Sequence, residues 1–305
     1  MTVQPGTDAD VGVIGLGAMG GAMAATLHRA GWNVTGFDPS PDARRAAENA
    51  GVKTVAELSA LAGLPRVLLS LPAAALVEAT LNELLPVGGT RVVIDTTTSD
   101  PLTTQAMVEL GATTGTEVVD APVSGGPTGA ASGSLTAFVG GSQEAVTAAT
   151  PVLNSLTGGS FRHVGNAGAG NVVKLLNNLL CATNLVAVAE ALDVAAAFGI
   201  DRAVASGAIS DASGGSTASS SMFPKWVHTG SFDSGFALCL MARDVTLALD
   251  VAEQQNVLPT LLQGTRSAWN RALDILGPRA DFTQVVNTVS TAAAADHPAP
   301  VRSDP

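Results

Sequence analysis

Cysteine and basic residues are scarce in this sequence, and each shortage excludes a class of protein. The chain has 305 residues but only two cysteines, Cys181 and Cys239. Their spacing fits neither a metal site nor a disulfide framework, so we expect no metal and a reducing cytoplasm. Lysine and arginine number 15 against 26 aspartates and glutamates, which gives a formal net charge of −11. That charge argues against nucleic acid or an anionic membrane surface as the main partner.

Charged residues of both signs are also few, at 13%, whereas 46% of the residues are apolar. This balance is typical of a globular protein, and the length suggests two domains. The first ten residues contain no apolar run, so no signal peptide is expected. Residues 171–198 are apolar enough to resemble a membrane span, but they include Lys174, Glu190 and Asp193. We therefore predict a long helix of about 40 Å inside a protein rather than in a membrane.

Strand and helix patterns alternate through the first half of the chain. Strand-like runs occur at 11–14, 33–37, 66–71, 91–94, 117–119 and 135–139, and helical patterns at 19–30, 41–50, 55–62, 73–85, 101–110 and 142–156. This alternation predicts an α/β domain with a doubly wound, mainly parallel sheet and right-handed crossovers. We expect this domain to occupy residues 1–167.

After residue 170 only helical patterns remain, at 171–198, 201–209, 222–228, 235–255, 258–275 and 281–290. They predict an all-α second domain at residues 168–291, followed by a disordered tail at 292–305. Residues 210–221 are small and polar, so they form either a linker or an active-site loop. The small residues there leave room for a substrate, and no lysine or arginine lies between Arg202 and Lys225 to bind a second carboxylate.

Residues 15–20 read Gly-Leu-Gly-Ala-Met-Gly and lie between a predicted strand and a predicted helix. In that position the pattern is typical of dinucleotide binding. The first glycine permits a tight turn, the second lets the backbone approach a pyrophosphate, and the third lets the helix pack close to the strand. The helix N-terminus then presents N–H groups to the phosphates. The predicted cofactor residues of this turn are Gly15, Leu16, Gly17, Ala18, Met19 and Gly20.

Asp38 ends the second predicted strand, where a carboxylate can accept hydrogen bonds from the adenosine ribose and repel a 2′-phosphate. It therefore favours NAD over NADP. The alternative is a plain turn residue, because Asp38 begins the run Asp-Pro-Ser-Pro. Arg44 and Arg45 lie near enough in sequence to keep NADP open as the less favoured cofactor.

Two further segments carry polar groups suited to substrate binding and chemistry. Ser124, Gly125 and Gly126 follow a strand, and successive N–H groups in such a turn can bind a carboxylate. The segment Gly-Ala-Gly-Asn-Val-Val-Lys-Leu-Leu-Asn-Asn places Lys174 and Asn178 one helical turn apart. From these residues alone, the first segment is either an anion site or an ordinary turn, and the second is either a proton-transfer site or a partly exposed helix face.

Together these segments resemble the β-hydroxyacid dehydrogenase family, which includes 3-hydroxyisobutyrate dehydrogenase and tartronate semialdehyde reductase. Four signatures occur in order over about residues 10–290: Gly-Leu-Gly-Ala-Met-Gly at 15–20, Asp-Ala-Pro-Val-Ser-Gly-Gly at 120–126, Gly-Ala-Gly-x-x-x-Lys-x-x-Asn-Asn at 168–178, and Phe-x-x-x-Leu-Met-x-Arg-Asp at 236–244. The resemblance implies an N-terminal Rossmann domain, a long interdomain helix and a helical C-terminal domain of the 6-phosphogluconate dehydrogenase kind. It also implies an active site between the domains and a homodimer or homotetramer.

By the same resemblance, Lys174 is the catalytic general acid/base and Asn178 orients the substrate beside it. Oxidising an alcohol requires a base for the hydroxyl proton while hydride leaves for the nicotinamide, which agrees with an amine at this place. The substrate carboxylate is expected at the Ser124 turn. The resemblance adds cofactor contacts at Leu71, Pro72, Thr98 and Arg243.

Arg243 departs from the family pattern, which usually has a lysine before this aspartate. Arginine keeps the positive charge but cannot transfer a proton, so a cofactor contact survives the change and an acid/base role does not. The resulting prediction is an NAD-dependent oxidoreductase of a small, monocarboxylic 3-hydroxyacid. Two alternatives stay open: an NADPH-dependent reductase of an aldehyde acid such as glyoxylate or succinic or tartronate semialdehyde, and a non-catalytic binding module of the same fold. Lys174 and the acidic charge argue against the module.

Overall fold

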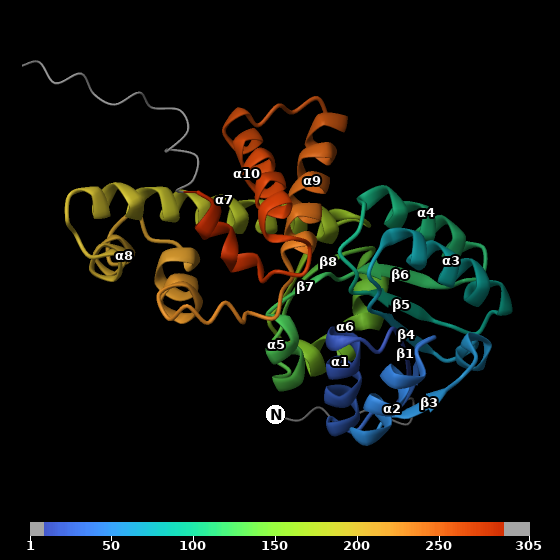
Figure 1. The fold of residues 1–305 in the computed structure, drawn as a ribbon. Coiled ribbons are helices and arrows are strands. Elements are labelled where there is room, and N and C mark those ends of the chain that lie inside the picture. The colour runs from blue at the N-terminus through green and yellow to red at the C-terminus, as the bar shows by residue number, and fades with distance from the viewer. Residues whose placement is uncertain (1–8, 290–305) are drawn as a thin grey trace, which may run out of the picture. The chain divides into compact units, whose positions relative to one another are not determined.

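The strands predicted in the first half of the chain lie side by side in one sheet. The computed structural model describes residues 9–289, so the tail predicted at 292–305 lies outside the described residues. Within that range the sheet has the order β3-β2-β1-β4-β5-β6-β8-β7, with β9 beside β8 (Figure 1). The strands are β1 Asp10–Ile14, β2 Asn33–Phe37, β3 Lys53–Val55, β4 Arg66–Leu69, β5 Val92–Asp95, β6 Glu117–Asp120, β7 Val123–Ser124, β8 Thr136–Gly140 and β9 Phe161–Gly165.

The sheet is parallel from β3 through β6, and its register brings the carboxyl ends of these strands to one edge. Ile14 pairs with Phe37 on one side and with Leu69 on the other. Leu69 pairs with Asp95, which in turn pairs with Asp120. Strand β8 runs antiparallel to β6 and β7. The doubly wound, mainly parallel sheet predicted from sequence is therefore confirmed, and the residues after each parallel strand meet at the same edge.

Helices cover both faces of this sheet (Figure 1). On one face, apolar side chains of the sheet pack with α1 (Ala18–Arg29), α2 (Pro41–Asn49), α5 (Gly126–Ser132) and α6 (Gln143–Thr157). On the other face they pack with the short 3₁₀ helix η1 (Leu58–Leu61), α3 (Ala74–Leu84), η2 (Leu85–Val87) and α4 (Pro101–Ala112). Side chains from both faces are fully buried, among them Val13 and Leu69 at 0% exposure. The strands are apolar throughout for this reason.

Several local predictions were wrong or incomplete. The helix predicted at 55–62 is absent: the described chain has strand β3 and only the four residues of η1 there. Two β-branched residues, Thr54 and Val55, pair with β2 instead. Strands β7 and β9 and helix α5 were not predicted, because two to seven residues carry too little periodicity to detect.

The residues from Leu175 onward form a second compact unit, divided from the first between Lys174 and Leu175. It contains most of α7 (Ala169–Ala197), α8 (Arg202–Ser210), the π-helical η3 (Ala218–Val227), α9 (Leu238–Gln254), α10 (Thr260–Leu276) and the 3₁₀ helix η4 (Phe282–Thr288). A stacked pair, Trp269 and Phe282 at 6.4 Å between ring centroids, lies in its core. The helical prediction is confirmed, apart from an isolated bridge between Ala237 and Asp281.

The segment predicted as a loop at 210–221 becomes helical at its end. Ser216 and Ser219 cap this start reciprocally: the Ser219 hydroxyl accepts from Ser216 N–H at 3.0 Å, and the Ser216 hydroxyl accepts from Ser219 N–H at 3.3 Å. Serines that read as linker composition thus begin η3.

Helix α7 is long and apolar enough to span a bilayer by length and composition alone. Four of its leucines instead pack in the core of the second unit together with α9 and α10: Leu175, Leu179, Leu185 and Leu192. Three polar residues near its start, Asn171, Lys174 and Asn178, are also buried, whereas Asn177, Asn184 and Glu190 are exposed. The prediction of a core helix is therefore the one that the packing supports.

Candidate active site

The glycine turn after β1 is folded as a phosphate-binding turn requires. Gly15 has φ +88°, and a Cβ there would lie 2.3 Å from the Ser70 carbonyl oxygen. A Cβ on Gly20 would lie 1.8 Å from the Gly15 carbonyl oxygen, so helix and turn are in backbone contact. Both positions therefore exclude any side chain.

Gly17 differs from these two glycines and tests whether a dinucleotide fits. A Cβ at Gly17 would meet no described atom within 4 Å, so the backbone faces open space. Among residues 9–289, no side chain caps α1 at Gly17, which leaves the N–H groups of the first turn available to an anion. Gly17 and Ala18 are exposed, whereas Leu16 is buried in the core. The turn therefore fits a pyrophosphate approaching the helix N-terminus.

Asp38 lies at the end of β2, beside this turn. Its Oδ2 accepts a hydrogen bond from the Leu16 N–H at 2.8 Å, and its Oδ1 accepts one from the Ser40 N–H at 2.8 Å. The carboxylate thus fixes the glycine turn, a role that the sequence did not predict. Each carboxylate oxygen has a second lone pair, which leaves capacity for ribose hydroxyls. Arg44 donates from Nη1 to the Asp38 carbonyl oxygen at 2.6 Å.

The other predicted cofactor residues of the first unit follow neighbouring strands at the same sheet edge. Leu71 and Pro72 come after β4, and Thr98 comes after β5. The two loops are joined, because the Leu71 N–H donates to the Thr97 hydroxyl oxygen at 3.1 Å. Ligands of open parallel sheets bind at this edge, next to the point where the strand order reverses. In the observed order that point lies at β1, between β2 and β4.

Ser124 ends β7, and the two glycines after it form an open turn. Gly125 and Gly126 have φ values of +127° and +63°, which favour glycine. Both glycines are exposed, and a Cβ at Gly126 would meet no described atom within 4 Å. Ser124 pairs with Thr136 of β8, so its backbone is fixed while its neighbours stay accessible. This geometry leaves room for the carboxylate predicted from sequence.

Lys174 lies in the second turn of α7 and is 7% exposed. An amine at this degree of burial is unusual, since lysine is almost never fully buried unless it interacts with other groups. Asn178 is one turn further along the same helix and 5% exposed. A partly exposed helix face, the alternative left open from sequence, does not describe this side chain.

In the second unit, Asn178 belongs to a chain of polar side chains. Its Nδ2 donates to Asp244 Oδ2 at 2.7 Å, and its Oδ1 accepts from Asn177 Nδ2 at 3.2 Å. Arg243 donates to the other Asp244 oxygen from Nε at 3.1 Å and from Nη2 at 2.8 Å. Asp244 is 1% exposed and sets the orientation of the Asn178 amide.

Asp244 was missed by the sequence reasoning, although it stands in the fourth signature beside Arg243. An aspartate on an otherwise apolar helical face is a signal for a buried partner. Residues 238, 241, 242, 245, 248 and 249 of α9 are buried, and position 244 lies within that face. The apolar periodicity of α9 could have predicted that Asp244 is buried, but it could not have predicted the contact with Asn178.

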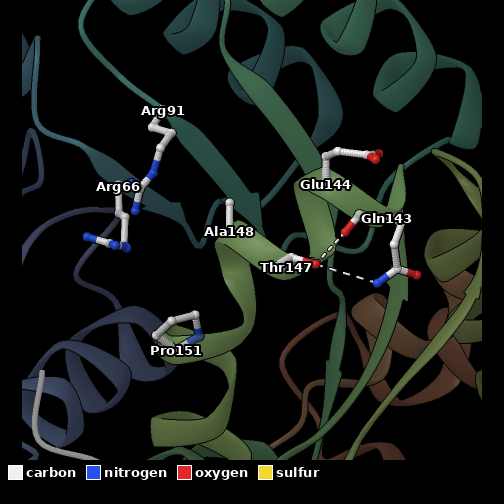
Figure 2. A pocket seen from close by; sticks show the side chains of 7 residues that line it. All are labelled: Arg66, Arg91, Gln143, Glu144, Thr147, Ala148 and Pro151. Atoms are coloured by element: carbon white, nitrogen blue, oxygen red, sulfur yellow. Dashed lines mark hydrogen bonds between the residues drawn. The ribbon is translucent and has the colours of Figure 1, made fainter. Parts of the chain in front are cut away.

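A cavity of about 490 Å³ lies elsewhere in the first unit (Figure 2). It is lined by Arg66, Arg91, Gln143, Glu144, Thr147, Ala148 and Pro151. Arg66 begins β4 and Arg91 precedes β5, so this cavity lies at the amino ends of the strands. The predicted cofactor residues of the first unit follow the carboxyl ends of the strands, and the cavity is therefore separate from them.

Two family models match nearly the whole described chain. Residues 10–165 match the NAD-binding domain of 6-phosphogluconate dehydrogenase. Residues 168–289 match the model described as NAD-binding of NADP-dependent 3-hydroxyisobutyrate dehydrogenase. The first unit is thus an NAD-binding Rossmann domain, as the glycine turn predicted.

Individual relatives agree with these models. The 2-(hydroxymethyl)glutarate dehydrogenase of Eubacterium barkeri is 36% identical over 84% of this chain and 87% of its own. The 3-hydroxyisobutyrate dehydrogenase of Pseudomonas aeruginosa is also 36% identical, over 80% and 85%. The structure of Mycobacterium tuberculosis 3-hydroxyisobutyrate dehydrogenase with L-serine has a TM-score of 0.86 at 30% identity and covers 92% of this chain and 99% of that one. The chain belongs to the β-hydroxyacid dehydrogenase family of NAD-dependent oxidoreductases.

Proposed function

We propose that this protein oxidises a small 3-hydroxyacid with a primary alcohol, using NAD, and that Lys174 is the general acid/base. The observation that carries the proposal is the buried amine of Lys174 on α7, in a chain whose glycine turn fits a dinucleotide. The compounds in the names of the two dehydrogenases and the L-serine of the Mycobacterium tuberculosis structure share one chemical group. 3-Hydroxyisobutyrate, 2-(hydroxymethyl)glutarate and serine each carry a CH₂OH group on the carbon next to a carboxylate.

The side chains divide the reaction between them. The neutral amine of Lys174 accepts the proton of the substrate hydroxyl as the carbon–hydrogen bond of the carbinol breaks. NAD, held at the glycine turn, would supply the acceptor for the carbinol hydrogen as hydride, so the products would be an aldehyde acid, reduced cofactor and a protonated Lys174. The Asn178 amide, oriented by Asp244, hydrogen-bonds the substrate. The Ser124 turn binds the carboxylate through the hydroxyl and backbone N–H groups.

NAD is the preferred cofactor in this proposal, with Asp38 as the selecting residue. Its carboxylate is fixed by two backbone N–H groups, which places negative charge where a 2′-phosphate would come. Arg44 and Arg45 already have partners: Arg44 donates to the Asp38 carbonyl, and Arg45 pairs with Asp42. These partners disfavour, without preventing, a role in binding NADP.

The substrate is proposed to be monocarboxylic, because no lysine or arginine lies between Arg202 and Lys225. A panel of 3-hydroxyisobutyrate, serine, 2-(hydroxymethyl)glutarate and 3-hydroxypropionate with NAD and NADP, followed by absorbance of the reduced cofactor, tests the proposal. We expect turnover with NAD and a monocarboxylic acid. Preference for the glutarate would overturn the monocarboxylic choice. Activity only in the reverse direction, with NADPH and an aldehyde acid, would favour the reductase alternative. A folded chain that binds NADH but turns over none of these compounds in either direction would favour a binding module.

We further propose that the protein self-associates through α7, as a homodimer or homotetramer. Large apolar side chains recur on one side of this helix and directly after it: Leu176, Leu180, Val194 and Phe198, which are 44%, 54%, 60% and 82% exposed. They span about 33 Å, and a soluble protein rarely exposes an apolar stripe of that length. One chain has a mass of 30.4 kDa, so light scattering should give a particle mass of a multiple of that value. Phe198→Glu should lower the particle mass. A monomeric mass for both wild type and Phe198→Glu would contradict the proposal.

We also propose a cytoplasmic setting, with which the two free cysteines agree.

A further inference from the structure

A buried carboxylate contacts the start of α7 in the first unit. Asp120 ends β6 and is 0% exposed. Its Oδ1 accepts a hydrogen bond from the Gly168 N–H at 2.8 Å, and its Oδ2 accepts one from the Asn171 N–H at 2.7 Å. Gly168 directly precedes α7 and Asn171 lies in its first turn, so neither N–H has a partner within the helix itself. Asp120 therefore caps α7 from a strand that lies far away in sequence.

Two glycines allow this approach. A Cβ at Gly140 would lie 2.4 Å from Asp120 Oδ1. A Cβ at Gly170 would lie 2.4 Å from the Phe138 carbonyl oxygen and 2.8 Å from Asp120 Oδ2. Strand, carboxylate and helix backbone are thus packed without room for a methyl group, so the first turn of α7 has a single position in this unit.

The Asn171 side chain connects the same turn to the loop after β5. Asn171 is 0% exposed. Its Oδ1 accepts from the Ser99 N–H at 3.0 Å, and its Nδ2 donates to the Thr104 hydroxyl at 3.2 Å. Ser99 follows Thr98, the cofactor contact proposed for this loop. One amide therefore fixes the distance between the cofactor loop and the helix that carries Lys174, three residues further on.

Burial and hydrogen bonding act on the pKa of Asp120 in opposite directions. Burial raises the pKa of Asp120, and the hydrogen bonds from Gly168 and Asn171 act in the opposite direction by favouring the carboxylate. The positive end of the α7 dipole adds to that effect. A second carboxylate, Asp95, pairs with Asp120 across β5 and β6 and is 3% exposed. A buried carboxylate beside another is costly, which argues that the contact with α7 has a use beyond filling the core.

We propose that Asp120 and Asn171 are positioning residues for the dehydrogenase reaction: together they fix the first turn of α7 against the loop at Thr98 and Ser99, and so set where the Lys174 amine meets the bound substrate. The inference rests on the function proposed above. Neither residue touches the reacting atoms in this scheme. A displaced base costs rate in the chemical step, about 10- to 100-fold for a shift near 1 Å, and leaves cofactor binding alone.

The test compares Asn171→Ala and Asp120→Asn with a matched control at the other end of the same strand. The Thr116 hydroxyl, just before β6, donates to the Thr90 carbonyl oxygen at 2.8 Å and is buried, so Thr116→Val removes a comparable hydrogen bond away from the site. Initial rates with the best hydroxyacid of the panel give kcat and KM for all four proteins. Fluorescence titration gives the NADH dissociation constant, and hydrogen exchange reports on residues 168–174.

We expect kcat to fall about 10- to 100-fold in Asn171→Ala and Asp120→Asn, with KM and the NADH dissociation constant within about twofold of wild type. A substrate deuterated at the carbinol carbon should show an isotope effect at least as large as that of wild type, because the chemical step has slowed. Amide exchange in residues 168–174 should be faster. Thr116→Val should change neither kcat nor the amide exchange of residues 168–174, even if its melting temperature falls as much as those of the two test variants.

Faster exchange at residues 168–174 with kcat within twofold of the control would overturn the proposal, since the contacts would then be structural only. A wild-type protein inactive with every hydroxyacid would instead refute the proposed function and, with it, this inference. If Asp120→Asn yields no folded protein by circular dichroism, Asn171→Ala and Asn171→Ser decide on the same readouts.

Discussion

Helix α7 is contacted near its start by two clusters, each centred on a buried carboxylate. In the first unit, Asp120 accepts hydrogen bonds from the backbone N–H groups of Gly168 and Asn171. In the second unit, Asp244 accepts from the side chains of Asn178 and Arg243. A carboxylate bound to backbone fixes where a helix lies, whereas one bound to side chains fixes how an amide is turned. Lys174 lies in sequence between the two clusters.

Both clusters are proposed to serve catalysis by Lys174, so removing the Lys174 amine should have the largest effect on turnover. Lys174→Ala takes away the proposed base and should lower kcat about 10²- to 10⁴-fold, the range of general acid–base catalysis. The NADH dissociation constant should stay within about twofold, because the glycine turn at residues 15–20 is a separate element. Steady-state rates and fluorescence titration check both values. A kcat close to that of wild type would remove Lys174 from the mechanism and leave the clusters without a catalytic purpose.

Ser124 lies in neither cluster, so a substitution there tests substrate binding without disturbing the position of α7. Ser124→Ala removes one charge-assisted hydrogen bond to the substrate carboxylate, worth roughly 1.5–3 kcal/mol. That loss corresponds to about a 10- to 150-fold fall in kcat/KM, with NAD binding unchanged. Kinetics with the acid and with its ester distinguish the roles. Equal loss with both would place the serine on the reacting hydroxyl, and no loss with either would leave an ordinary turn.

Asp244→Asn should sharpen the contrast with Asp120. The carboxylate uses one oxygen for Asn178 and the other for Arg243, and the new amide replaces one of these oxygens by a donor, so Asn178 loses its fixed orientation. We expect KM for the hydroxyacid to rise about tenfold, with a smaller change in kcat. This is the reverse of the pattern expected for Asp120→Asn. Measured side by side, identical changes in kcat and KM for the two variants would show that the clusters do not differ in role.

These two clusters also mark where sequence reasoning stopped. The alternation of strands and helices, and glycines such as Gly15 and Gly17, depend on local spacing, and they predicted the sheet and the cofactor turn. The contacts of Asp120 with Gly168 and Asn171 join residues 48 and 51 positions apart, and that of Asn178 with Asp244 spans 66. No local period encodes such pairs, because tertiary packing alone brings them together. The short strands β3, β7 and β9 were missed for a related reason: their partners define them more than their own residues do.

Asp38 is a third carboxylate bound to backbone, but it lies partly exposed at the sheet edge. Asp38→Ala should weaken NAD binding by a few-fold to tenfold and narrow the gap to NADP, because the ribose acceptor and the negative charge are both lost. Asp38→Asn is the control: it removes the charge and one acceptor oxygen, and it keeps one acceptor for either the Leu16 or the Ser40 N–H. KM values for NAD and NADP separate the two effects. Unchanged preference in both variants would make Asp38 a residue of the turn alone.

Asp95 should affect turnover least and stability in a way that depends on pH. Burial raises its pKa from 3.8 to about 7, hydrogen bonds from Thr97 act against that rise, and the charge of Asp120 adds to it. A folded-state pKa above the unfolded value means that the folded protein binds the proton more tightly. The stabilisation is therefore complete below about pH 4 and is lost as pH rises through 7. Asparagine cannot ionise. The free energy of unfolding of Asp95→Asn should therefore rise relative to that of wild type between pH 5 and pH 8, by about 1 kcal/mol or more. Urea unfolding at both pH values measures the difference. A difference that stays constant from pH 5 to pH 8 would show that Asp95 keeps one charge state across this range and would contradict the raised pKa.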